Sequence, residues 1–313
     1  MHSVASTLHW AVFFALIALL LALDLGIFHR RSLTDSFRAA IGWSAFWIGV
    51  SLLFNGWVYL ELGGEPALAF FTGYLLEKAL SVDNIFVFLL IFRFFAVPSD
   101  HQHRVLYWGV LGAILLRAVF VLAGAALLQR FEWIFYLFGA FLLWTGVKLM
   151  RHHEPEIHPE HNPVVRAFQR LFPITSDYHG RHFFVRRDGR WMATPLMLVL
   201  VVIEASDVVF AVDSIPAIFG VTTDPFLVFS SNILAVLGLR ALYFVLRNLM
   251  DRFRYLSAGL GLVLLLVGVK MVLHELVEIP TAVSLAVVVG VLGLSVLLSW
   301  LQPGRDADAG KDR

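Results

Sequence analysis

Nine runs of about 20 mostly apolar residues make up most of this 313-residue chain, and a run of that length crosses a bilayer as one α-helix. Hydrophobic residues account for 59% of the chain and the mean hydropathy is +0.79. So many apolar side chains cannot all be buried in one soluble domain. We therefore predict an all-α polytopic membrane protein with about nine transmembrane helices, at residues 8–28, 40–60, 67–92, 105–128, 133–150, 195–220, 226–246, 255–273 and 280–301.

Basic residues are distributed unevenly between the loops. If the N-terminus is outside, the inner segments carry 18 of the 24 Lys and Arg residues, and the outer segments carry only Arg130. Lys and Arg collect on the cytoplasmic side, so we predict an N-out, C-in protein of the bacterial inner membrane. Basic residues follow the first run, which is the wrong polarity for a cleaved signal peptide. The net charge of +1 gives no reason to expect a nucleic-acid partner, and the absence of Cys excludes disulfides and thiolate ligands.

One long segment, residues 151–194, lies on the predicted inner side. Its stretch PVVRAFQRLF (163–172) has an apolar face and two arginines away from it, which indicates an amphipathic helix at the membrane interface. Asp188-Gly189 between two short apolar runs predicts a β-hairpin. The His- and Glu-rich stretch 152–161 has two interpretations, a solvated loop that binds cations weakly and a metal sensor.

Three motifs recur in the same order in two sets of three helices. The pattern Glu77-x5-Asp83-Asn84-Ile85 recurs as Asp207-x5-Asp213-Ser214-Ile215, LRAVF (116–120) as LRALY (239–243), and GVKL (146–149) as GVKM (268–271). Helices 3–5 therefore correspond to helices 6–8, in the opposite orientation. Inverted repeats are typical of secondary transporters, whose substrate site lies near the midplane between the repeats. The alternative is that the similarity arises by chance among Leu- and Val-rich helices. Matches between ionisable residues in three successive helices argue against chance.

This repeat divides the chain into five parts. They are an N-terminal two-helix segment (1–66), a first repeat (67–150), the inner loop (151–194), a second repeat (195–279), and a last helix with its tail (280–313).

Five carboxylates lie inside the predicted spans: Glu77, Asp83, Glu204, Asp207 and Asp213. A charge at the bilayer centre costs about 2.5–3.5 kcal/mol on insertion scales, so these groups should face the bundle interior, a basic partner or a bound cation. Further oxygen donors accompany them on a possible metal path: Ser81, Asn84, Ser206, Ser214 and Asn232. Three basic residues could balance the charge: Lys78, Arg117 and Arg240. The alternative is that acids and bases pair only to hold the helices together.

Helix geometry limits how these acids can meet. At about 100° per residue, Asp83 lies about 240° from Glu77, so one cavity collects all five acids only if a helix unwinds or two helices enclose the site. Pro216 favours a break near Asp213. Oxygen ligands without Cys suit Mn²⁺, Mg²⁺ or Ca²⁺ better than Zn²⁺ or Cu⁺. Asn232 is either a ligand or an interhelical hydrogen-bonding group, and Asp24 either joins the site or lies at an interface.

The same motifs carry a family resemblance. The stretches EKALSVDNIFVFLLIF (77–92), TPLMLVLVVIEASDVVFAVDSIPAIFG (194–220) and SNILAVLGLRALYF (231–244) resemble the TerC family of bacterial membrane proteins, especially its Alx-like manganese-exporter branch. FFVRRDGRWMATP (183–195) resembles that family's inner loop. The resemblance covers roughly residues 8–301 and implies efflux of Mn²⁺ along a path formed by the five acids. The family takes its name from tellurium resistance.

Three functions remain as hypotheses. The first is a divalent cation exporter, not an enzyme, that works by alternating access on Mn²⁺ with protons as the counter-ion and needs no resident cofactor. The second is a membrane scaffold for a tellurium or metal stress response, which recruits soluble partners through residues 151–194. The third is an exporter of a small organic solute, whose site should have an aromatic lining and fewer acids. The sequence predicts the bilayer and the cation as partners but no oligomeric state.

Overall fold

The part of the chain that the computed structural model describes is mostly helical. The structure describes residues 3–28, 37–131, 133–151, 163–187, 189–247, 255–273 and 279–301. The helices are α1 (Thr7–Phe28), α2 (Phe37–Leu62), α3 (Gly64–Phe94), α4 (Ser99–Arg130), α5 (Trp133–Arg151), α6 (Pro163–Leu171), α7 (Pro195–Phe219), α8 (Pro225–Leu237), α9 (Leu239–Leu246), α10 (Leu256–Val272) and α11 (Thr281–Leu301). Two strands, β1 (Phe184–Arg187) and β2 (Arg190–Ala193), lie between α6 and α7.

Several of these helices are long and apolar enough to cross a membrane. All nine predicted ranges fall on helices, with the seventh divided between α8 and α9. Among the described residues, five helices meet the criteria of length and composition for a span, or six if α8 and α9 count as one. α3 is not among them because it carries Glu77, Lys78 and Asp83 along with other charged residues. The fold is therefore that of an all-α membrane protein, and the count of nine spans stays a prediction.

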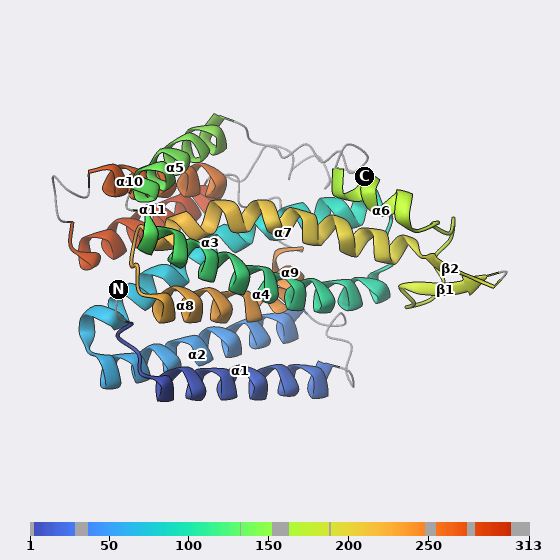
Figure 1. The fold of residues 1–313 in the computed structure, drawn as a ribbon, viewed down its shortest axis with the longest axis horizontal. Helices are drawn as coiled ribbons and strands as arrows, with labels where there is room; N and C mark the ends of the chain where they lie inside the picture. Colours follow the sequence, from blue (N-terminus) through green and yellow to red (C-terminus); the bar gives the residue numbers. More distant parts are fainter. Residues whose placement is uncertain are drawn as a thin grey trace.

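Four helices, α3, α4, α7 and α8, pack against one another at the centre of the fold (Figure 1). α8 is buried from Phe226 to Leu237, including its polar residues Ser230, Ser231 and Asn232. α1 and α2 lie on one side of this group, and α5, α10 and α11 lie on the opposite side (Figure 1). Asp224 caps α8 by accepting hydrogen bonds from the N–H groups of Phe226 and Leu227, and it also accepts one from Val4. The N-terminal segment is thereby tied to the start of α8.

Glycines bring the backbones of α5 and α10 into direct contact. A Cβ placed on Gly146 would lie 2.7 Å from the carbonyl oxygen of Gly261, and one on Gly268 would lie 2.9 Å from that of Gly139. The earlier glycine of each helix therefore meets the later glycine of the other, so the two helices run antiparallel. Small residues allow this close approach between membrane helices, where packing rather than hydrophobic burial drives association.

The predicted break at Pro216 is absent. α7 continues through Pro216 to Phe219: the proline removes only its own N–H bond to the preceding turn, and the helix ends one turn later. The described residues instead show a bend of 46° between α8 and α9, at Gly238. The interruption thus falls beside the LRALY stretch (239–243) rather than beside Asp213.

The inner segment contains the predicted hairpin. β1 and β2 pair antiparallel, with Phe184 opposite Ala193, and Gly189 has a positive φ of 78° in the turn. The segment is attached to α3 by Tyr178, whose hydroxyl donates to the carbonyl of Phe95 at 2.7 Å and whose pKa is raised by burial. α6 buries Val165 and exposes Arg166 and Arg170, in keeping with an amphipathic helix, but Leu171 of its predicted apolar face is 74% exposed. The His-rich stretch 152–161 lies outside the described residues.

Candidate cation site

Glu77, Arg117 and Asn232 form a closed hydrogen-bonded triad at the centre of the bundle. They come from α3, α4 and α8 and are 0%, 2% and 0% exposed. Arg117 Nη1 donates to Glu77 Oε1 and, at 2.6 Å, to Asn232 Oδ1, while Asn232 Nδ2 donates to Glu77 Oε2 at 3.3 Å. Of the two interpretations of Asn232, the structure shows the interhelical hydrogen bond. A buried charge is tolerated when it is paired in this way.

Lys78, the next residue on α3, has a backbone group as its partner. Its ammonium donates to the carbonyl oxygen of Ala235 at 3.0 Å, and it lies 5.9 Å from the ring centre of Tyr74. Ala235 lies just before the α8–α9 bend. A Cβ on Gly238 would be only 2.8 Å from the Lys78 nitrogen, so glycine at the bend leaves room for the ammonium. Lys78 therefore supplies positive charge at the interrupted end of α8.

Asp207 of α7 has a buried carboxylate that makes no hydrogen bond within the described part of the chain. It is 4% exposed, and neither of its oxygens has a hydrogen-bond partner among the residues that the structure describes. Electrostatic interactions connect it with Arg117, Glu77 and Glu204. An unpaired buried carboxylate is strongly unfavourable, so it must be protonated or have a cation bound. Each unsatisfied buried polar group of this kind calls for an explanation.

The predicted hydroxyl and amide donors have different environments. Ser81 and Ser214 are buried, and their hydroxyls have no partner among the described residues. Ser206 donates to the carbonyl of Val202 at 2.9 Å within its own helix. Asn84 is buried on α3. Ser81 and Ser214 are thus better placed than Ser206 to supply oxygens to a ligand.

Glu204 lies one turn before Asp207 and is half-buried. A Cβ placed on Gly112 of α4 would lie only 2.0 Å from Glu204 Oε1. The carboxylate therefore rests directly on the backbone of α4, in space that any larger residue at 112 would fill. Gly112 could not be predicted from the sequence, because a glycine in an apolar helix gives no signal until its neighbour on another helix is known.

The remaining predicted residues are only partly placed. Asp83 and Asp213 lie on α3 and α7, but their side chains are outside the described part of the structure, as is that of Asp24. Arg240 is buried on α9, with its guanidinium 5.5 Å from the ring centre of Tyr107. No three Asp, Glu or His side chains among those described are arranged to hold a metal ion. The described structure thus brings together Glu77, Arg117, Asn232, Asp207 and Glu204.

Comparisons with known proteins identify similar sequences. The model of the integral membrane protein TerC family matches residues 62–307. A Myxococcus xanthus membrane protein, STKORF319, described as uncharacterized, is 50% identical over 313 residues, which cover 99% of this chain and 98% of that protein. An Escherichia coli K12 protein described as a candidate membrane-bound redox modulator, Alx, is 46% identical over 320 residues, which cover 99% and 100%. A Rickettsia bellii membrane protein is 38% identical over 293 residues, which cover 94% and 97%. No solved structure matches significantly.

Proposed function

This chain belongs to the TerC family of integral membrane proteins, as its motifs predicted, and we propose that it exports a divalent cation, Mn²⁺, across the bacterial inner membrane. The observation that carries the proposal is the unpartnered, buried carboxylate of Asp207. A protein in which that group does no chemistry would be more stable with an apolar or amide side chain there. A cation or proton that arrives and leaves accounts for its retention.

Charge balance supports a divalent substrate. If all candidate groups are ionised, the five acids and the three basic residues together carry a net charge of two negative units. One divalent cation neutralises them, and so do two protons. Hard oxygen donors without cysteine favour Mn²⁺ over softer metals. Exchange of a cation for protons at Asp207 would also provide the energy for export, because a proton gradient then drives the release of the metal.

Helix packing supports two inverted repeats. We propose that α3–α5 and α7–α10 are these repeats, in a protein of nine spans with the N-terminus outside. Under that relation α3 corresponds to α7 and α4 to α8 with α9. α3 packs against α8 and α4 packs against α7, which are matching pairs. The reciprocal glycine contacts between α5 and α10 are matching pairs as well.

The two repeats differ at their acids, and this difference suggests an order of events. In the first repeat, Glu77 accepts hydrogen bonds from Arg117 and Asn232. Its counterpart Asp207 has no hydrogen-bond partner among the described residues. Glu204 is more exposed than Asp207. We propose that a cation meets Glu204 first, then binds at Asp207, and is released on the other side after the repeats move relative to each other, as in other inverted-repeat transporters.

Uptake into inverted membrane vesicles tests this function. We expect the wild type to accumulate Mn²⁺ when a pH gradient is present, and Asp207→Asn to lower the initial rate by about tenfold or more, the usual effect of losing a group that supports a metal site. Asp224→Asn is a matched control because asparagine also caps helices well. Wild-type rates in Asp207→Asn would contradict the proposal. Uptake of amino acids but not Mn²⁺ would favour the organic-solute exporter instead.

The name of the E. coli relative, a membrane-bound redox modulator, suggests a redox role as a second candidate. This chain contains no cysteine, so thiol–disulfide exchange within it is excluded. In our proposal a redox effect arises through the concentration of a redox-active cation such as Mn²⁺. The exposed arginines of the β1–β2 hairpin also suit the scaffold hypothesis. Capture of soluble partners by the full-length protein, without any Mn²⁺ uptake, would support the scaffold in place of the exporter.

A further inference from the structure

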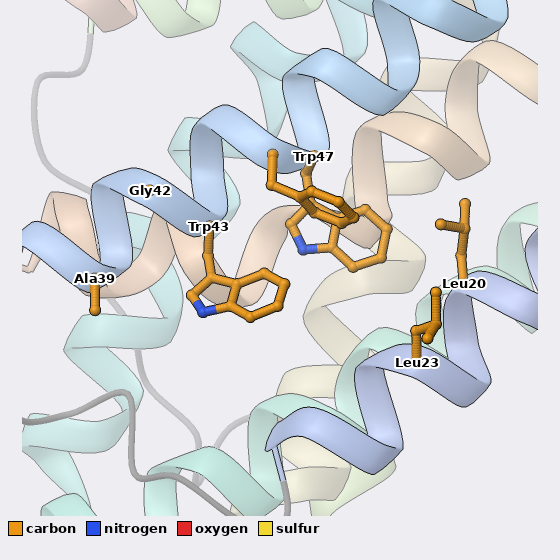
Figure 2. A pocket seen from close by; sticks show the side chains of 7 residues that line it. Leu20, Leu23, Ala39, Gly42, Trp43 and Trp47 are labelled. Atoms are coloured by element: carbon orange, nitrogen blue, oxygen red, sulfur yellow. The ribbon is translucent and has the colours of Figure 1, made fainter.

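A groove of about 500 Å³ lies between α1 and α2, away from the acidic cluster. Its lining includes Leu20 and Leu23 of α1 and Gly42, Trp43, Phe46 and Trp47 of α2. Figure 2 shows the two indole rings in the space between α2 and the leucines of α1. Leu23 and Phe46 are 44% and 42% exposed, so the groove opens on the outside of the helix bundle. α2 meets the criteria for a membrane span, and the opening therefore faces hydrocarbon.

Arg38 provides a positive charge at one end of this groove. Arg38 is exposed and lies one turn before Gly42 on α2. Residues four apart share a helix face, so Arg38 is on the side of α2 that lines the groove. Arginines near the ends of membrane helices extend to the headgroup region, and a guanidinium binds phosphate oxygens through two parallel hydrogen bonds. The apolar groove and the charge together match an acyl chain joined to an anionic headgroup.

We propose that the groove binds one acyl chain of an anionic phospholipid, whose phosphate is held by Arg38. The volume lies within the range of small-molecule sites, and Trp43 and Trp47 provide broad apolar surfaces for a methylene chain. A second copy of this chain is a poorer match, because a partner helix would bring a full row of side chains rather than one thin chain. The proposal concerns lipid binding and does not depend on cation export.

The inner wall of the groove is shared with the α8–α9 bend. Trp47 is 3% exposed, and a Cβ on Gly238 would lie 3.0 Å from its Cβ. The same Cβ would lie 2.8 Å from the Lys78 nitrogen. A chain seated in the groove holds Trp47 against the bend and so opposes changes in the bend angle. The lipid would therefore act on the helix pair that carries Asn232 of the site.

Lipid retention by the purified full-length protein tests the proposal. The protein is equilibrated in micelles with phosphatidylglycerol and phosphatidylethanolamine of equal chain length, and the bound lipid is counted by native mass spectrometry. Gly42→Leu should fill part of the groove, and its Cβ would meet no other atom within 4 Å. Gly49→Leu is the matched control: it is on the same helix and equally open, but outside the groove. We expect the wild type and Gly49→Leu to retain phosphatidylglycerol and Gly42→Leu to lose it.

A second variant tests the headgroup without touching the groove. Both lipids carry a phosphate, but the ammonium of phosphatidylethanolamine already neutralises it. Arg38→Gln should therefore lower the preference for phosphatidylglycerol over phosphatidylethanolamine by about fivefold, because one arginine near a net anionic headgroup contributes about 1 kcal/mol. Equal retention by Gly42→Leu and the wild type would overturn the chain site, and an unchanged preference in Arg38→Gln would overturn the headgroup assignment. If Gly42→Leu instead changes the oligomeric state and leaves lipid retention unaltered, a second copy covers the groove and the proposal is wrong.

Discussion

Replacing Glu77 with glutamine tests the buried triad because it removes one charge and nearly preserves the side chain's shape. Glu77 and Arg117 are almost fully buried, and Glu77 is the acidic partner in their ion pair. In Glu77→Gln, the guanidinium keeps Asn232 as a hydrogen-bond acceptor but loses its counter-charge. Breaking a buried pair by removing one partner costs about 3–5 kcal/mol. We expect the free energy of unfolding to fall by about that amount, measured by equilibrium unfolding in mixed micelles.

Two further variants identify the cause of this loss. Adding Arg117→Gln to Glu77→Gln removes both charges and should recover most of the stability, which gives a large coupling energy in the double-mutant cycle. Asp207→Asn makes the same chemical change on a neighbouring helix, but at an unpartnered carboxylate, so stability should stay the same or rise. A loss of less than about 0.5 kcal/mol in Glu77→Gln, the size of an ordinary surface effect, would refute the reasoning. So would an equal loss in Asp207→Asn.

Three other predictions follow from local packing. Gly112→Ala should displace the Glu204 carboxylate, whose Oε1 lies 2.0 Å from the added Cβ, and slow Mn²⁺ uptake in vesicles; uptake equal to the wild type would contradict this. Gly146→Ala should destabilise the protein by about 1–3 kcal/mol through overpacking against the α10 backbone, whereas Gly290→Ala on α11, with no atom within 4 Å, should not; unfolding measurements compare the two. Asp224→Ala should cost about 1 kcal/mol through loss of the α8 cap, and thermal unfolding beside Asp224→Asn shows whether capping is responsible.

The helices and the hairpin were predictable because their signals are local. Apolar runs of bilayer length marked the helical ranges, and Asp188-Gly189 marked the turn between β1 and β2. The predicted position of the helix interruption, near Pro216, was wrong for a physical reason. Pro216 is a strong helix breaker in general, but it lies where α7 is already ending, whereas a single glycine such as Gly238 costs a helix only about 1 kcal/mol and so gives a weak signal.

The site was only partly predictable because its pairing depends on tertiary structure. The positions of Glu77 and Asp207 inside long apolar helices showed that both must face the bundle interior. Nothing in their spacing indicated that Glu77 would be hydrogen-bonded in a triad or that Asp207 would lack a hydrogen-bond partner among the described residues. That difference arises from the residues that neighbouring helices present, and asparagine and arginine on α8 and α4 are equally consistent with ligands, counter-charges or helix staples.

The two glycine contacts between α5 and α10 limit how these two helices can move relative to each other. Gly139 and Gly146 are about two turns apart, so sliding or separating the helices breaks both contacts at once. A rotation whose axis runs along the α5–α10 pair preserves both glycine contacts. In such a rotation the displacement grows with distance from the axis. In that rotation, α1 and α2 would move furthest, because they lie at the opposite side of the molecule (Figure 1).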